Sequence, residues 1–181
     1  MAKQFDSIDE RHSAFIQQQK IFFVATAGAE GRINLSPKGM DSFRVCSPNT
    51  IRWLNYTGSG NETAAHLYEN GRITVMFCSY EGPPLILRLY GNGRVIYPRD
   101  PLWHESLARF PEKSGARQII EVEVDLVQTS CGYAVPLFEY QGERDTLVRW
   151  SKKKGDAGIK AYWEEHNQIS IDGKPTHILD E

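Results

Sequence analysis

The sequence is poor in cysteine and contains no long apolar run. Its 181 residues include three cysteines, an odd number without C-x-x-C spacing, at Cys46, Cys78 and Cys131. We therefore predict no disulfide framework and a reducing, cytoplasmic location. No stretch approaches the roughly 18 apolar residues that span a membrane, and the polar N-terminus has no signal-peptide pattern. These absences predict that the protein has no membrane partner.

Positive charge is not in excess either. Lysine and arginine number 21 and aspartate and glutamate 23, which gives a formal net charge of −2. Too few cations are left over to neutralise a run of phosphates, so nucleic-acid binding is not expected as the main function. The five histidines lack H-x-x-x-H and H-E-x-x-H spacing, so no metal site is predicted. The length and the 40% apolar share are typical of one folded domain with an appendage.

Short apolar segments separated by turn signals make up most of the chain. We predict about seven strands, at 21–26, 33–36, 42–46, 50–56, 72–79, 85–97 and 118–129. Helices are predicted at 7–19, 62–69 and 100–110, and at 147–166 with an interruption near Gly155. Because most of the strands have no helix between them, a parallel α/β sheet is excluded. A mainly β, closed or nearly closed antiparallel barrel is expected instead.

Four local signals add detail to this prediction. Ser7, with Glu10 three residues later, is expected to cap the first helix. The Asn-Gly pair at 70–71 predicts a helix end, and the Gly-Asn-Gly run at 91–93 predicts a bulge or bend within a long strand. Pro37 cannot donate a ladder hydrogen bond, so the chain is expected to leave the sheet at that residue.

The segment 57–63 combines two glycines with short polar side chains at the start of a predicted helix. Free backbone N–H groups and the positive end of the helix dipole suit such a position to an anion. The same residue types also form ordinary turns and helix caps, so both interpretations stay open. Lys38, at the end of a predicted strand, is either a cation that meets a ligand or a solvated loop lysine.

A series of motifs in a fixed order resembles the pyridoxamine 5'-phosphate oxidase family, and more narrowly its oxidase-related flavoproteins. The resemblance covers residues 8–136 and lies in FVAT at 23–26, NLSPKG at 34–39, RWLNYTGS at 52–59, AHLYENGRITVMF at 65–77, LRLYGNGRV at 87–95 and SCGYAVP at 130–136. It implies an antiparallel split β-barrel of six to seven strands with short flanking helices. It further implies a homodimer that binds FMN between its subunits, with 1–140 as the FMN-binding domain and 141–181 as a charged helical extension packed on it.

Carried over residue by residue, the resemblance also implies a cofactor site. Ser36 and Lys38 fall where the second strand meets the flavin, and Trp53, Leu54 and Asn55 fall on the strand that lines the isoalloxazine ring. The phosphate or ribityl chain would be held by Ser59, Asn61, Glu62 and Thr63. Glu62 would have to face away from the phosphate or cap the helix, because a carboxylate beside a phosphate costs energy.

The sequence departs from the true oxidases at this helix. They carry an Arg-Lys pair there, whereas Glu62 and Thr63 stand at the matching positions. Other cations must then neutralise the phosphate, and the candidates are Lys38, Arg52, Arg88, Arg94 and Arg117 from the partner subunit. The oxidase's substrate-binding arginine and histidine have no convincing match, so pyridoxamine phosphate is not the expected substrate.

The expected function is therefore that of an FMN-dependent oxidoreductase acting on an unidentified small molecule. The cofactor would carry the redox chemistry while the protein orients it, and no acid–base residue is assigned. Two alternatives stay open. The same fold could hold a deazaflavin or haem, and haem would need an axial ligand such as a histidine. The protein could also bind flavin without catalysis, because a fold does not fix a function.

Overall fold

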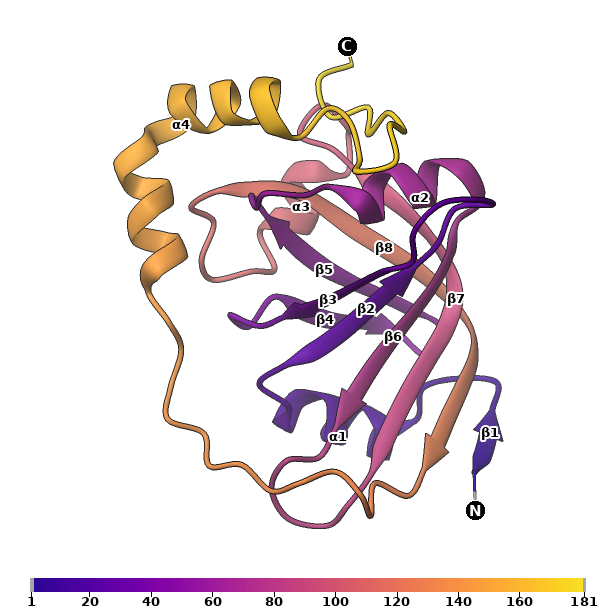
Figure 1. The fold of residues 1–181 in the computed structure, drawn as a ribbon. Coiled ribbons are helices and arrows are strands. Elements are labelled where there is room, and N and C mark those ends of the chain that lie inside the picture. Colours follow the sequence, from indigo (N-terminus) through magenta and orange to yellow (C-terminus); the bar gives the residue numbers. More distant parts are fainter. Residues whose placement is uncertain (1, 181) are drawn as a thin grey trace.

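A curled antiparallel sheet of eight strands forms the body of the protein (Figure 1). The computed structural model describes residues 2–180. The strands are β1 (Lys3–Phe5), β2 (Phe22–Thr26), β3 (Asn34–Lys38), β4 (Phe43–Ser47), β5 (Thr50–Tyr56), β6 (Arg72–Cys78), β7 (Ile86–Ile96) and β8 (Ala116–Ser130). The helices are α1 (Glu10–Gln18), α2 (Glu62–Asn70), α3 (Trp103–Leu107) and α4 (Thr146–His166).

The sheet has the order β3-β2-β6-β7-β8-β5-β4, and β1 pairs with the C-terminal end of β8. The two edge strands, β3 and β4, do not close on each other among the described residues, which leaves the barrel split. This architecture confirms the predicted mainly β fold. The additional strand, β1, has only three residues and no alternating pattern, so only its pairing with β8 identifies it.

Alternation along the strands builds two apolar cores. Side chains such as Val24, Val75 and Leu89 are fully buried inside the barrel. The opposite face of β5 contributes Leu54 to a second cluster, where it packs against Trp103 of α3. Successive side chains of a strand point to opposite faces, so a strand covered on both sides is apolar throughout. Trp53 and Leu54 therefore lie in different cores.

Three local predictions differ from the structure. Asp9 caps α1 in place of Ser7. Its side chain accepts a hydrogen bond from the His12 backbone N–H, and the His12 side chain accepts one from the Asp9 backbone N–H. The chain does not leave the sheet at Pro37, because β3 is an edge strand and proline is tolerated where no partner needs its N–H. The helix predicted at 100–110 shortens to α3, which leaves the flanking residues in turns.

Other local signals agree with the structure. Gly71 ends α2 in the left-handed conformation, and Gly155 interrupts α4 with a φ of 64°. The register of β7 against β8 shifts between Tyr90 and Gly91, which is the predicted bulge. A Cβ atom on Gly91 would lie 2.0 Å from the carbonyl oxygen of Glu123, so only glycine fits at this position.

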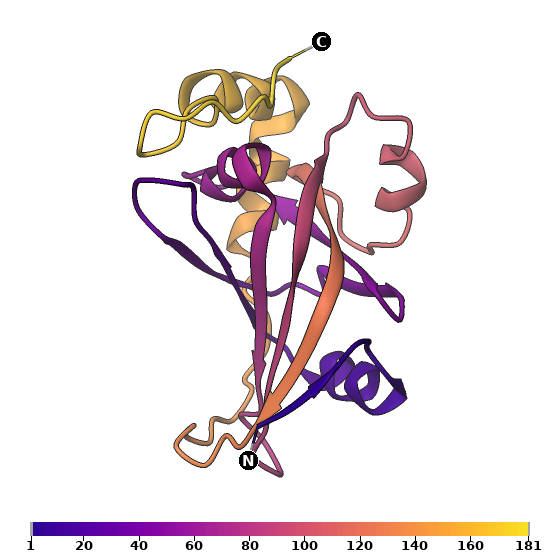
Figure 2. The ribbon, with the colours of Figure 1, turned by 90° about the vertical axis from the view of Figure 1, so that its right-hand side faces the viewer.

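The C-terminal part of the chain runs around the barrel. Residues 131–145 form an extended arm without helix or strand, which leads to the kinked helix α4 (Figure 1). Beyond α4, residues 167–178 form a segment that we call the strap, and it lies over α2 (Figure 2). Within the described chain, no helix is both long and apolar enough to cross a membrane.

Candidate functional site

A β-bulge places two polar side chains at the end of the barrel where α2 begins. β5 and β8 pair Asn55 with Gln118 but Tyr56 with Ala116, so Arg117 is the additional residue. A bulge of this kind re-aims side chains, and both Arg117 and Gln118 are buried as a result. Gln118 donates to the side chain of Asn61 over 2.8 Å, which ties β8 to the N-terminus of α2.

Arg117 is a buried cation without a carboxylate partner among the described residues. Its Nη1 donates to the carbonyl oxygens of Gly60 at 2.9 Å and Gly58 at 3.4 Å, and to Asn167 Oδ1 at 2.9 Å. Its Nε makes no hydrogen bond. Burial lowers the pKa of Arg117 to about 10. An unpaired buried charge is costly, and an anion close to it would offset that cost.

Lys38 is a second cation in the same region. Its Nζ donates to Asn55 Oδ1 over 3.2 Å. Burial, followed by the charge of Arg117, lowers the pKa of Lys38 to about 8. Asn55 is a neutral acceptor, and no carboxylate within the described chain forms an ion pair with Lys38. Lys38 and Arg117 therefore form a pair of mutually repelling cations.

The Lys38 pKa predicts how the free energy of unfolding depends on pH. Lys38 titrates near 8 when folded and near 10.5 when unfolded, so the folded state binds fewer protons between these values. Stability should rise with pH across this window, and the full cost of the buried charge is present below pH 8. From pH 7 to pH 10 the free energy of unfolding of the wild type should rise by about 1–2 kcal/mol relative to that of the Lys38→Met variant, a value reduced for the partial solvent exposure of Lys38. Urea denaturation measures both proteins, and an unchanged difference would contradict the burial of this charge.

A second polar network joins β3 to α2. Asn34 Nδ2 donates to Thr63 Oγ1 at 3.1 Å and to Thr26 Oγ1 at 3.2 Å, while Asn34 Oδ1 accepts from Ser36 at 2.9 Å. Thr26 also contacts the buried His66 of α2. Asn34 was not among the predicted site residues, although the alternation of β3 puts it on the same face as Ser36 and Lys38.

In the loop between β5 and α2, the backbone carbonyl groups point toward the protein interior, while the residues themselves are exposed to solvent. Gly58, Ser59 and Gly60 are exposed, while Arg117 and Asn167 hold their carbonyl oxygens. Asn61 is the N-cap of α2 but makes no side-chain capping bond. The carboxylate of Glu62 accepts from the backbone N–H of Ile171 in the strap, so Glu62 is turned toward the strap.

The structure brings most of the predicted residues together. Lys38 and Arg117 form the cation group, and Asn55 accepts a hydrogen bond from Lys38. Hydrogen bonds through Asn34 join Ser36 to Thr63 of α2, and Gln118 bonds to Asn61 at the start of that helix. Trp53 and Leu54 lie apart from this group, fully buried in the two cores. Arg117 reaches the loop of its own chain, so its presence there needs no second subunit.

Three further cations predicted as phosphate ligands are engaged elsewhere. Arg52 and Arg94 both pair with Glu121 on β8. Arg88 donates to the hydroxyl of Ser130. Of the candidate cations, Lys38 and Arg117 are thus the two that lie together without a carboxylate among the described residues.

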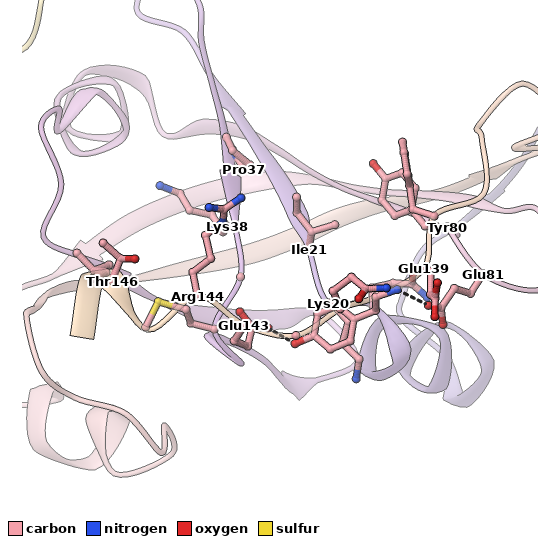
Figure 3. Close-up of a pocket in the computed structure, with 18 of the residues that line it drawn as sticks. Lys20, Ile21, Pro37, Lys38, Tyr80, Glu81, Glu139, Glu143, Arg144 and Thr146 are labelled. Atoms are coloured by element: carbon pink, nitrogen blue, oxygen red, sulfur yellow. Dashed lines mark hydrogen bonds between the residues drawn. The ribbon is translucent and has the colours of Figure 1, made fainter. Parts of the chain in front are cut away.

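A cavity of about 1200 Å³ lies between the barrel and the arm (Figure 3). Aromatic side chains of Tyr80, Phe138, Tyr140 and Trp150 line it. Lys38 also lines it and is the only predicted site residue that does. Sequence reasoning missed this cavity because its walls come from segments far apart in the chain, and the arm carries no periodic pattern.

Comparison with known proteins agrees with the fold. The family model described as pyridoxamine 5'-phosphate oxidase matches residues 8–131. Protein ustO of Aspergillus flavus is described as a pyridoxamine 5'-phosphate oxidase family protein. It is 42% identical over an alignment of 191 positions, which covers 94% of this chain and 76% of ustO.

Two solved structures share the fold at low sequence identity. HupZ of Group A Streptococcus is 21% identical, with a TM-score of 0.53 over 66% of this chain and 91% of that one. HutZ of Vibrio cholerae, described as a haem storage protein, is 18% identical, with a TM-score of 0.52 over 70% of this chain and 97% of that one. Because the family model covers most of the chain and ustO resembles nearly all of it, this protein belongs to the pyridoxamine 5'-phosphate oxidase family.

Proposed function

We propose that the protein is an FMN-binding oxidoreductase that works as a homodimer. The observation that carries this proposal is the pair formed by Lys38 and Arg117, two buried or half-buried cations without a carboxylate partner among the described residues. Arg117 bonds to an exposed glycine loop at the start of a helix, and Lys38 is close enough to Arg117 for the two charges to repel each other. Cations beside such a loop suit a phosphate group. Membership of the family makes flavin the first candidate to carry this phosphate.

The residues present fit a phosphate dianion. Two cations can offset its charge, and the exposed backbone of 58–60 lets an oxygen approach closely. Glu62 bonds to the strap through Oε2, but its Oε1 lies beside Gly60, where a Cβ atom would be 3.2 Å away from it. The two cations must therefore outweigh the repulsion of this one carboxylate. In this proposal the Arg-Lys pair of the true oxidases is replaced by Arg117, which reaches the loop from β8, and by Lys38 of β3, which bonds to Asn55.

The flavin would supply hydride or single-electron transfer, and the protein would supply binding and orientation. Lys38 belongs both to the cation group and to the wall of the large cavity. A ligand whose anionic group lies at Lys38 has the aromatic side chains of that cavity beside it. Trp53 and Leu54 are fully buried, so in this proposal they support β5 from within the cores and do not contact the ring.

The arm supports the proposed homodimer. Tyr133, Leu137 and Phe138 are each more than half exposed on this extended segment. Large apolar side chains that gather on a surface mark a contact with another molecule. A second copy of the chain seated against the arm would cover them and would also narrow the cavity between the arm and the barrel.

The proposal is tested by the visible spectrum and mass of the purified protein. We expect a yellow protein, or a colourless one that takes up added FMN, with twice the mass of a single chain by light scattering. A Soret band would favour haem, as in the protein described as HutZ, although no histidine lines the cavity in the described part of the chain. A monomer that takes up no FMN would overturn the proposal.

A further inference from the structure

Asn167 holds the glycine loop from the far end of the chain. It is fully buried at the C-terminus of α4. Its Nδ2 donates to the carbonyl oxygens of Gly58 at 2.9 Å and Ser59 at 3.4 Å, and its Oδ1 accepts from Arg117 at 2.9 Å. One amide side chain therefore fixes two carbonyl groups of the loop and the cation beside them.

The direction of these carbonyl groups decides where the loop N–H groups point. In a trans peptide the C=O and N–H of one unit point in opposite directions, and every described peptide bond is trans. The carbonyl groups of residues 58, 59 and 60 share their peptide units with the N–H groups of Ser59, Gly60 and Asn61. Because these carbonyl groups point toward the interior, the three N–H groups point outward. None of these three N–H groups has a hydrogen-bond acceptor within the described structure.

The strap keeps Asn167 in its place. The Asn167 backbone carbonyl accepts from the hydroxyl of Thr176 at 2.5 Å. The carbonyl of Thr176 in turn accepts from the hydroxyl of the buried Tyr97. Further along the strap, Asp172 pairs with Arg32 and Lys174 pairs with Glu69. These contacts anchor the segment to the residue that follows β7, to α2 and to the hairpin between β2 and β3.

We infer that Asn167 is a positioning residue for an anion-binding loop whose ligands are the N–H groups of Ser59, Gly60 and Asn61. This inference rests on the proposed function, since it concerns the same phosphate. It adds that the C-terminal strap is part of the site without touching the ligand. The anion itself would contact the backbone N–H groups, while Arg117, which lies on the carbonyl side of the loop, would act on it through its charge and by holding the loop in place.

Inorganic phosphate and FMN together test this inference. Adding phosphate to the wild-type protein should shift the backbone amide resonances of Ser59, Gly60 and Asn61 in ¹⁵N-resolved NMR spectra. In Asn167→Ala these shifts should disappear at the same phosphate concentration, and the Kd for FMN should rise about tenfold or more. Asn167→Asp should bind no better than Asn167→Ala, because it loses both donated bonds and adds a negative charge beside Arg117.

A destabilised control separates positioning from general stability. Ile159 is buried on α4, and its apolar side chain cannot hydrogen-bond to the loop. Ile159→Ala should therefore lower the melting temperature but leave the phosphate shifts and the FMN affinity within about twofold of wild type. Equal phosphate and FMN binding by wild type and Asn167→Ala would overturn the role of Asn167 while leaving the proposed function intact. Phosphate binding that depends on Asn167 in a protein that ignores FMN would overturn only the proposed cofactor. Binding of neither ligand would overturn both.

Discussion

Replacing Arg117 with methionine is expected to weaken FMN binding about a hundredfold. Arg117 is a buried cation, and every hydrogen bond that it donates goes to a neutral oxygen. Losing this charge close to the phosphate, together with the bonds that hold the loop carbonyls, is expected to cost about 1.5–3 kcal/mol, which corresponds to a factor of about 10 to 150 in the dissociation constant. Methionine keeps most of the apolar volume and removes the charge. Fluorescence titration of FMN with the apoprotein measures the change.

Arg94→Met is the matched control for this prediction. It makes the same chemical change at an exposed arginine that pairs with Glu121 on β8. Surface ion pairs contribute little to stability, so this variant should fold and bind FMN as the wild type does. If Arg117→Met and Arg94→Met bound FMN equally well, Arg117 would have no part in the site.

Replacing Gly91 with alanine is expected to destabilise the protein by at least about 3 kcal/mol and to prevent folding in the extreme case. The new Cβ would lie 2.0 Å from the carbonyl oxygen of Glu123 and 2.9 Å from its carbonyl carbon. Both atoms are backbone, so relief requires β7 and β8 to separate at the bulge. These two strands form the centre of the sheet and carry much of the main core. Urea denaturation followed by far-UV circular dichroism measures the loss.

Gly158→Ala is the control for the glycine substitution. A Cβ at this position in α4 would lie 3.4 Å from carbons of the Lys154 side chain, which is an ordinary contact. Alanine has the higher helix propensity, so we expect no loss or a gain of up to about 1 kcal/mol. A Gly91→Ala protein as stable as Gly158→Ala would show that the strands can give way at the bulge.

Features that depend on neighbours in the sequence could be predicted. The short apolar segment between turn signals predicted β5 with the bounds that the structure has, 50–56. The end of α2 at Gly71 and the break of α4 at Gly155 were also predicted, because left-handed glycines leave a local signal. The family resemblance, which combined such local motifs in order, is confirmed for the fold and the family.

Features that depend on distant pairing could not be predicted in the same way. Arg117 reaches the loop because β8 shifts register against β5, and no residue nearby in the sequence marks that bulge. The sequence therefore suggested Arg117 only as a contribution from a partner subunit. Asn167 lies more than a hundred residues beyond the loop that it holds, and an asparagine at a helix end is too common to stand out. The whole set of predicted cofactor ligands stays a prediction.

The central claim is that Lys38, Arg117 and the loop at 58–60 bind the phosphate of FMN. Riboflavin has the same ring and ribityl chain but no phosphate, so it isolates this contribution. We predict that the wild-type protein binds FMN at least about a hundredfold more tightly than riboflavin at pH 7, and that Lys38→Met loses at least about tenfold of this preference. Equal affinities of the wild-type protein for FMN and riboflavin would contradict the account.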